Sequence, residues 1–256
     1  MDMLFLGTCA CEPSPRFKTE LKDSFDMNVR RTSAALLRDD ILLDAGKFIL
    51  DSIRIAEVDT SLIKNILITH LHRDHFDKDN VAAIAAGRSE PIRIFVREDA
   101  DVPDISGVEY VKMTPFKKYE VDIGVFVTGL PANHAPDTAP QHLLIEADGK
   151  KIFYGGDGAW MLHDSFKFLS KAHLDIAVFD CTCGDYNGDF RAGEHNSIPM
   201  LRCLIPSLGT IEAIDGNTLV YATHLAPKLH ATHDKTVELL SDSGINVAFD
   251  GLRLDV

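Results

Sequence analysis

The chain has 256 residues, of which 45% are hydrophobic and 25% charged, and its formal net charge at pH 7 is -13. This length suits one large domain or two fused halves, and the composition is that of an ordinary globular protein. The negative charge argues against nucleic-acid binding, which depends on lysine and arginine contacts to phosphate.

No apolar run approaches the roughly 20 residues that span a membrane. The N-terminal stretch MDMLFLG is apolar but short, without the basic leader and long apolar core of a signal peptide. We therefore expect no membrane contact and a cytoplasmic location.

Short apolar runs bounded by turn residues predict strands, and amphipathic stretches between them predict helices. The expected strands are 3–7, 33–38, 41–46, 65–70, 92–96, 124–130, a hairpin over 143–157 turning at Asp148-Gly149, 175–181, 218–224 and 245–251. The expected helices are 47–58, 78–87, 163–171, 196–205 and 233–243, with Asn80, Ser197 and Asp234 as cap candidates. Residues 8–32 predict a long loop. A pair of mixed sheets covered by helices is the simplest packing of this order.

Residues 69–75, THLHRDH, place three histidines and an aspartate at the end of a predicted strand. Residues two apart in an extended chain point to the same side, so His70 and His72 can reach one ion. Asp74 and His75 are adjacent, so their side chains diverge, and we expect them to serve a second ion nearby. Imidazole and carboxylate ligands suit zinc, manganese or iron.

A site with two metal ions needs further ligands, and later strand ends offer them. His134 follows the strand that ends at Leu130, Asp157 ends the predicted hairpin, and His224 ends the strand TLVYATH. Two glycines before Asp157 allow the backbone to approach closely. A single histidine at a strand end is more often a hydrogen-bonded structural residue, but together the positions predict one shared site.

HLHRDH resembles the H-x-H-x-D-H signature of the metallo-β-lactamase superfamily, and ILLDAG, ANH, GGD and ATH occur in that family's order. The resemblance covers nearly the whole chain. It implies an α/β (α+β) fold, a four-layer αβ/βα sandwich. It further implies a single domain over residues 1–256, made of two similar halves, approximately 1–130 and 131–256.

The same resemblance implies a division of the ligands between two divalent cations. His70, His72 and His134 would hold one cation, Asp74, His75 and His224 the other, and Asp157 would bridge them. Asp44, in ILLDAG, would orient a ligand histidine through its other ring nitrogen. The cations would share a hydroxide as nucleophile, and their charge outweighs that of Asp74 and Asp157, so the site favours an anion despite the acidic chain.

A hydrolase of this kind must also protonate its leaving group. His195, in GEHNSIPML at the start of a predicted helix, can act as a general acid near neutral pH, or it can be a locally bonded histidine. An extra histidine in this region also marks RNase Z and the phosphoribosyl cyclic phosphodiesterases of phosphonate breakdown. FLGTCACEPSP resembles the start of both groups, and RRTSAALL and VAFDGLRLDV resemble the cyclic phosphodiesterases.

We therefore expect a metal-dependent hydrolase of a small anionic phosphodiester, such as a cyclic sugar phosphate, with His195 and Asp74 as catalytic residues. One alternative is an RNase Z-like nuclease that processes RNA 3′ ends, although the net charge and the lack of a long insertion oppose it. Another is a non-catalytic relative that binds metal or a nucleotide. Relatives of this type often form homodimers, so a homodimer is also expected.

Several residues remain open between two interpretations. Cys9, Cys11, Cys181 and Cys183 form either a structural zinc site or buried thiols, and the cyclic phosphodiesterases carry more cysteines after the first strand. Arg30 and Arg31 either clamp a phosphate or are solvated. His230 and His233 line the pocket, unless His233 simply begins the last helix. Trp160 either walls the pocket or packs in the core, and Asp137 and His142 are possible supports of the ligands.

Overall fold

The computed structural model describes residues 2–10, 21 and 23–255. Its strands form two mixed sheets of seven strands each. The first has the order β14 (Arg253–Asp255), β1 (Asp2–Gly7), β2 (Ala34–Leu37), β3 (Ile41–Leu43), β4 (Asn65–Leu67), β5 (Ile92–Arg97) and β6 (Val108–Met113). The second has the order β13 (Ile245–Val247), β12 (Leu219–Thr223), β11 (Ile176–Asp180), β10 (Lys150–Tyr154), β9 (Gln141–Ala147), β8 (Val125–Pro131) and β7 (Lys118–Asp122).

The two sheets share one pairing pattern. In the first sheet the pairings β14–β1, β1–β2 and β2–β3 are antiparallel, and those from β3 to β6 are parallel. In the second, the pairings from β7 to β10 are antiparallel and those from β10 to β13 are parallel. The chain passes between sheets after Met113, upstream of the expected boundary near residue 130, and β14 returns to the first sheet.

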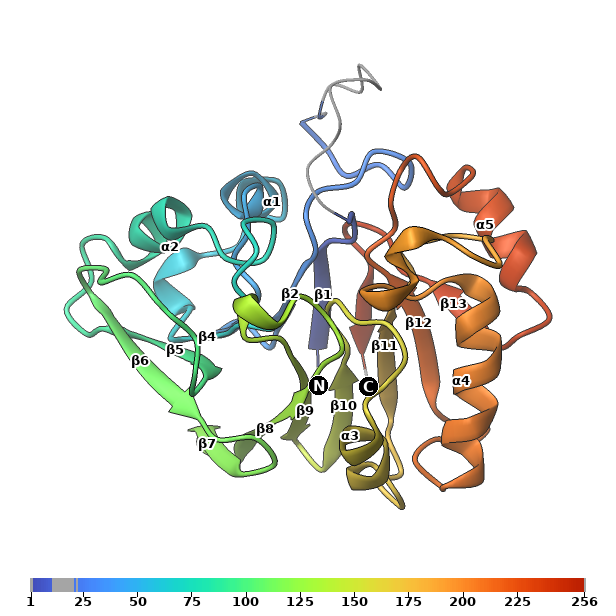
Figure 1. Cartoon of the computed structure of the whole chain (residues 1–256). Helices are drawn as coiled ribbons and strands as arrows, with labels where there is room; N and C mark the ends of the chain where they lie inside the picture. Colours follow the sequence, from blue (N-terminus) through green and yellow to red (C-terminus); the bar gives the residue numbers. More distant parts are fainter. Residues whose placement is uncertain (1, 11–20, 22, 256) are drawn as a thin grey trace.

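Apolar side chains of the two sheets meet in a central core. It includes Phe5, Leu37 and Leu67 from the first sheet and Val127, Ile145 and Val178 from the second. The outer face of the first sheet is covered by α1 (Ile49–Ile55) and α2 (Lys78–Ala85), and that of the second by α3 (His163–Phe168), α4 (Ile198–Thr210) and α5 (His233–Leu240). Figure 1 shows α1 and α2 on one flank and α4 and α5 on the other. The expected four-layer architecture is confirmed.

Short 3₁₀ turns complete the described elements: η2 (Thr60–Leu62), η3 (Pro136–Thr138) and η4 (Phe190–Gly193). The two ends of the chain lie together, because β1 pairs with β14 (Figure 1). In the part of the chain described, no helix is long and apolar enough to cross a membrane.

The sequence analysis missed β6, β7 and β14. β6 and β7 are edge strands of the two sheets, and each is only partly buried. β14, also at a sheet edge, lies beyond the predicted strand 245–251, of which only Ile245–Val247 is a strand. Exposed edge strands carry polar side chains on both faces, so a search for apolar runs passes over them.

One of the three predicted helix caps is confirmed and two are wrong. Ser197 caps α4 as expected, with its side chain accepting from the backbone N–H of Met200. Asn80 is not a cap, because Asp77 accepts the N–H groups of Asp79 and Asn80 at the start of α2. Asp234 is also not a cap, since α5 begins at His233 without a side-chain cap. Of the expected loop 8–32, residues 11–20 and 22 lie outside the described residues.

Candidate metal centre

The segment that carries THLHRDH is fastened to the segment that follows β3. The N–H of Ala45 donates to the carbonyl of His75 at 2.7 Å, and the N–H of Asp77 donates to the carbonyl of Ala45 at 2.9 Å. The backbones approach so closely that a Cβ on Gly46 would lie 1.7 Å from the carbonyl oxygen of Asp74. Only glycine fits there, so ILLDAG shapes the histidine loop as well as supplying Asp44.

The structure brings all seven expected ligand residues together in two groups. One group consists of His70, His72, His134 and Asp157, and the other of Asp74, His75, Asp157 and His224. Within each group one N or O atom per residue lies within 4.8 Å of all the others. The residues follow β4, β8, β10 and β12, so strand ends of both sheets meet at this site.

The spacing of the nitrogen atoms matches that of ligands around one cation. Nδ1 of His72 lies 3.1 Å from Nε2 of His70 and 3.1 Å from Nε2 of His134. Nε2 of His75 lies 3.2 Å from Nε2 of His224. Two imidazole nitrogens bound to one tetrahedral zinc ion at about 2.0–2.1 Å are about 3.3 Å apart.

Hydrogen bonds outside the site fix the ring nitrogen that three of the histidines turn inward. Nδ1 of His75 lies 2.8 Å from Oδ2 of Asp44, as the sequence analysis expects. Nδ1 of His224 lies 2.7 Å from Oγ1 of Thr182. Nδ1 of His134 lies 3.1 Å from the carbonyl oxygen of Glu194, which can only accept. With Nδ1–H donated outward, Nε2 presents a lone pair to the site.

Asp157 faces both groups. Its Oδ1 lies 3.2 Å from Nε2 of His75 and 3.0 Å from Nε2 of His224. Its Oδ2 lies 3.6 Å from Nε2 of His70 and 3.8 Å from Nε2 of His134. Oδ1 is buried and accepts no hydrogen bond. Oδ1 of Asp157 and the Nε2 atoms of His75 and His224 all present electron pairs to the same point. A positive charge at that point stabilises them, so the residues fit a divalent cation.

The electrostatics of the site point the same way. Burial raises the pKa of Asp157, but His224, His75 and His70 outweigh burial and hold this pKa well below its usual range. Burial lowers the pKa of His75, but the carboxylates of Asp157, Asp44 and Asp74 raise it well above the ordinary value. The site therefore keeps Asp157 ionised and attracts positive charge.

His195 lies beside these groups and is tied to Asp180. Its Nδ1 lies 2.7 Å from Oδ2 of Asp180, and its ring stacks on that of His224 with centroids 5.5 Å apart. Burial lowers the pKa of His195, but the charge of Asp180 and the hydrogen bond to it outweigh burial, and the pKa rises to about 9. With Nδ1–H donated to Asp180, Nε2 is the nitrogen available to another molecule.

Asp180 and Thr182 are site residues that the sequence analysis missed. Oγ1 of Thr182 donates to Oδ1 of Asp180 at 2.6 Å and lies 2.7 Å from Nδ1 of His224. One hydroxyl therefore connects His224 to Asp180, the residue that holds His195. Asp180 ends β11, and the strand-end rule that found His134 and His224 would also have found it. Thr182 carries no comparable signal in the sequence.

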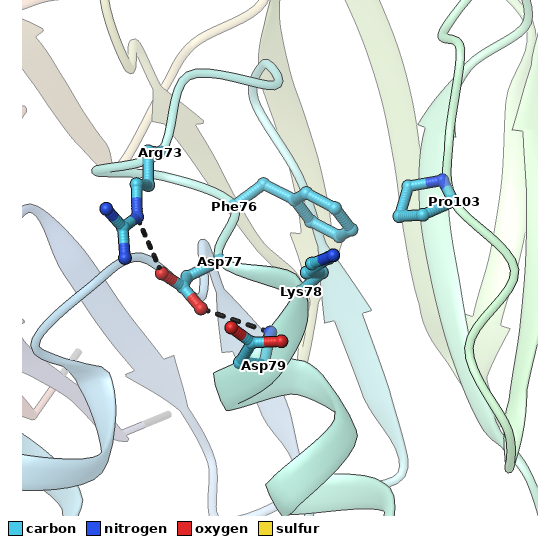
Figure 2. Close-up of a pocket in the computed structure, with 6 residues that line it drawn as sticks. All are labelled: Arg73, Phe76, Asp77, Lys78, Asp79 and Pro103. Atoms are coloured by element: carbon cyan, nitrogen blue, oxygen red, sulfur yellow. Dashed lines mark hydrogen bonds and ion pairs between the residues drawn. The ribbon is translucent and has the colours of Figure 1, made fainter.

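A hollow of about 360 Å³ adjoins the histidine loop, lined by Arg73, Phe76, Asp77, Lys78, Asp79 and Pro103. Figure 2 shows Phe76 pointing toward Pro103, with Arg73 at the other end. Nε of Arg73 donates to Oδ2 of Asp77 at 3.0 Å, so the carboxylate that caps α2 also holds Arg73 (Figure 2).

The cysteines do not gather into a metal site among the described residues. Cys9, Cys181 and Cys183 are buried, and no group of three possible ligands in that part of the chain includes a cysteine. Burial raises the pKa of Cys183 to about 11. Cys11 lies outside the described residues.

Arg30 and Arg31 are buried rather than solvated. Arg30 donates to Oγ1 of Thr8 at 2.6 Å and lies 3.1 Å from Nδ1 of His233, while Arg31 donates to Oδ2 of Asp51 at 2.6 Å. These bonds connect the N-terminal loop to neighbouring elements, and a phosphate role for either arginine stays a prediction.

Four other residues also have defined surroundings. His230 and His233 line a cavity of about 60 Å³ next to Arg30, and His233 also begins α5. Trp160 is 46% exposed, so the alternative that it packs in the core is wrong. His142 is buried and bonded through Nδ1 to the carbonyl of Gly155.

Paired sheets that carry two clusters of histidine and aspartate at their strand ends define the metallo-β-lactamase fold, whose members are metal-dependent hydrolases. Residues 40–246 match the family model described as Beta-lactamase superfamily domain, and the chain belongs to this family. A search of curated protein sequences finds no match.

Solved structures with the same fold are distant in sequence. The metallo-β-lactamase fold protein YhfI from Bacillus subtilis is 16% identical with a TM-score of 0.75, covering 99% of each chain. Zn(2+)-bound PqqB from Methylobacterium extorquens is 18% identical with a TM-score of 0.75, covering 100% of each chain. A diphosphatase from the PhnP family is 18% identical with a TM-score of 0.76, covering 100% of this chain and 97% of the other.

Proposed function

We propose that the protein hydrolyses small phosphodiesters with the help of two divalent cations. In this proposal His70, His72 and His134 would hold one cation, Asp74, His75 and His224 would hold the other, and Asp157 would be shared between them. Zinc and manganese suit these ligands best, and iron also suits them. The facing lone pairs described above support the assignment, and PqqB, a zinc-bound protein of the same fold, is consistent with it.

The cations, when bound, supply a water-derived nucleophile at neutral pH and polarise the phosphoryl oxygens. The chain's own residues orient the ligands and supply the proton for the leaving group. Asp44 and Thr182 orient the ligand histidines, so that the inward nitrogens are preorganised. His195 holds a proton at Nε2 and gives it to the leaving oxygen, while Asp180 fixes the ring and stabilises its protonated form.

The observation that carries the choice of reaction is the Asp180–His195 pair. A phosphodiester with a sugar or alkyl leaving group needs a proton donor within reach of its leaving oxygen, and the His195 ring, which stacks on His224, borders the proposed metal centre. The PhnP-family diphosphatase with the same fold also acts on a phosphorus centre. A small substrate is proposed because the net charge of -13 disfavours a long polyanion such as RNA. The homodimer and the cytoplasmic location stay predictions.

The proposal is tested with protein loaded separately with zinc, manganese and iron. Bis(4-nitrophenyl) phosphate, a cyclic ribose phosphate and a precursor tRNA are offered as substrates, and bound metal is measured by elemental analysis. We expect two metal ions per chain and turnover of both small diesters. Binding of metal without turnover of any diester would contradict the proposed reaction, and preferential cleavage of the tRNA would favour the nuclease alternative.

A further inference from the structure

The turn that leads into His195 carries an aromatic ring that is almost wholly in solvent. Phe190, the first residue of η4, is 91% exposed. Of the other large aromatic residues in the described part of the chain, Tyr186 and Trp160 are each 46% exposed, about half as much as Phe190. Large aromatic residues are usually at least half buried, and groups of exposed ones mark surfaces that contact a ligand or partner.

Bonds between Asp189 and Arg191 hold the η4 turn together. Asp189 accepts the N–H of Arg191 at 2.9 Å and holds the same guanidinium through Nε and Nη2, at 2.6 and 2.7 Å. The guanidinium carbon of Arg191 lies 4.8 Å from the centre of the Phe190 ring. The Phe190 ring thus projects from a turn that the Asp189–Arg191 bonds hold folded.

The η4 turn and the residue after it are hydrogen-bonded to His195 and His134. The N–H of His195 donates to the carbonyl of Arg191 at 2.8 Å, and the carbonyl of Glu194 lies 3.1 Å from Nδ1 of His134. Phe190 is therefore positioned relative to His195 and His134. His195 is the proposed proton donor to the leaving group, so this is the side of the site on which the leaving group lies.

We propose that Phe190 is a specificity-determining residue that stacks on a planar ring in the leaving group of the substrate. The inference rests on the proposed function and names its substrate class: phosphodiesters whose leaving group carries a nucleobase or another aromatic ring. A planar ring covers the exposed face of Phe190 and gains from stacking on it, while an aliphatic leaving group of the same charge gains less.

The test compares substrates that differ in the ring alone. The pair is adenosine 2′,3′-cyclic phosphate and the 2′,3′-cyclic phosphate of methyl riboside, with bis(4-nitrophenyl) phosphate as an aryl arm. The variants are Phe190→Ala and Phe190→Trp. The matched control is Ile123→Ala, because Ile123 is also 91% exposed but lies in the turn between β7 and β8.

In Phe190→Ala we expect the preference in kcat/KM for adenosine over methyl riboside to fall about 5- to 100-fold. Phe190→Trp keeps the preference, and Ile123→Ala leaves it unchanged. The aryl arm separates sources of the ring: a parallel loss with bis(4-nitrophenyl) phosphate indicates any aromatic group, and no loss there indicates a nucleobase.

A binding measurement separates this inference from the proposed function. Titration calorimetry gives Kd for adenosine 3′-monophosphate and for methyl riboside 3-phosphate in each variant, without any turnover. Loss of the preference for the adenosine ligand in Phe190→Ala supports the inference even if no diester is hydrolysed. The inference is overturned if the preference for the adenosine ligand is unchanged in Phe190→Ala, including the case in which this variant only dissociates a dimer. It is also overturned if the wild-type protein binds neither ligand.

Discussion

Oδ2 of Asp180 lies 2.7 Å from Nδ1 of His195, and the His195 ring in turn stacks on His224. Asp180 ends β11, His195 lies just before α4, and His224 follows β12. A carboxylate–imidazole pair thus stands against a ligand of the proposed metal centre, and its free nitrogen is Nε2. In the proposed mechanism His224 holds metal, and the Asp180–His195 pair moves the proton.

His195→Ala should slow the release of poor leaving groups far more than that of good ones. We expect kcat to fall about 100- to 10,000-fold for a diester with an alkyl leaving group, because the proton donor is lost. For bis(4-nitrophenyl) phosphate the fall should be under about tenfold, since nitrophenolate leaves without a proton. Elemental analysis should show unchanged metal content, and equal losses with both substrates would exclude a proton-donor role.

Asp180→Asn should act through His195. The amide cannot stabilise a protonated ring, so we expect kcat for the alkyl diester to fall about 10- to 100-fold. The same substitution in the His195→Ala background should have no further effect on that substrate, because the two residues act as one unit. Additive losses in the double variant would show that Asp180 works by another route.

Asp157→Asn should reduce metal binding at both groups. The substitution removes the charge that faces four histidine nitrogens and leaves only one oxygen able to accept a cation. We expect fewer than two metal ions per chain after dialysis, measured by elemental analysis. Asp137→Asn is the control, because Asp137 is exposed and belongs to neither group. Two tightly held ions in Asp157→Asn would contradict its bridging position.

Gly46→Ala should displace the histidine loop. The added Cβ would meet the backbone of Asp74, so we expect a loss of stability on the order of 1–3 kcal/mol, together with weaker metal binding. Thermal unfolding and metal titration measure the two effects. Gly209→Ala in α4 is the control, since a Cβ there meets nothing within 4 Å. Wild-type stability in Gly46→Ala would show that the loop is not packed as described.

Asp250 should make stability depend on pH. Burial raises its pKa to about 7, against the hydrogen bonds from Arg31 and Thr8 that lower it. Because the folded state holds this proton more tightly than the unfolded chain, the contribution is complete below about pH 4 and is lost as the pH rises toward 7. Denaturant unfolding should therefore show that wild type loses stability relative to Asp250→Asn across this range. A difference that does not change with pH would contradict the raised pKa.

The sequence by itself determined most of the strands and predicted the proposed ligands, for a local reason. Strands such as Ile41–Leu43 and Ile176–Asp180 are buried and mostly apolar, and the proposed ligands follow such strands within a few residues. A motif such as HLHRDH also carries its spacing with it. The sequence pattern did not predict the edge strands β6 and β7, because neither has a continuous apolar run.

Only the tertiary structure decided which residues act in pairs and which side chains remain exposed. Asp180 and His195 are 15 residues apart on different elements, and Asp44 reaches His75 across 31 residues. The two oxygens of Asp157 face different histidines because strand ends of both sheets converge on one point. The contact of Glu194 with His134 joins residues 60 apart, and no local pattern encodes a contact that depends on the packing of the whole chain.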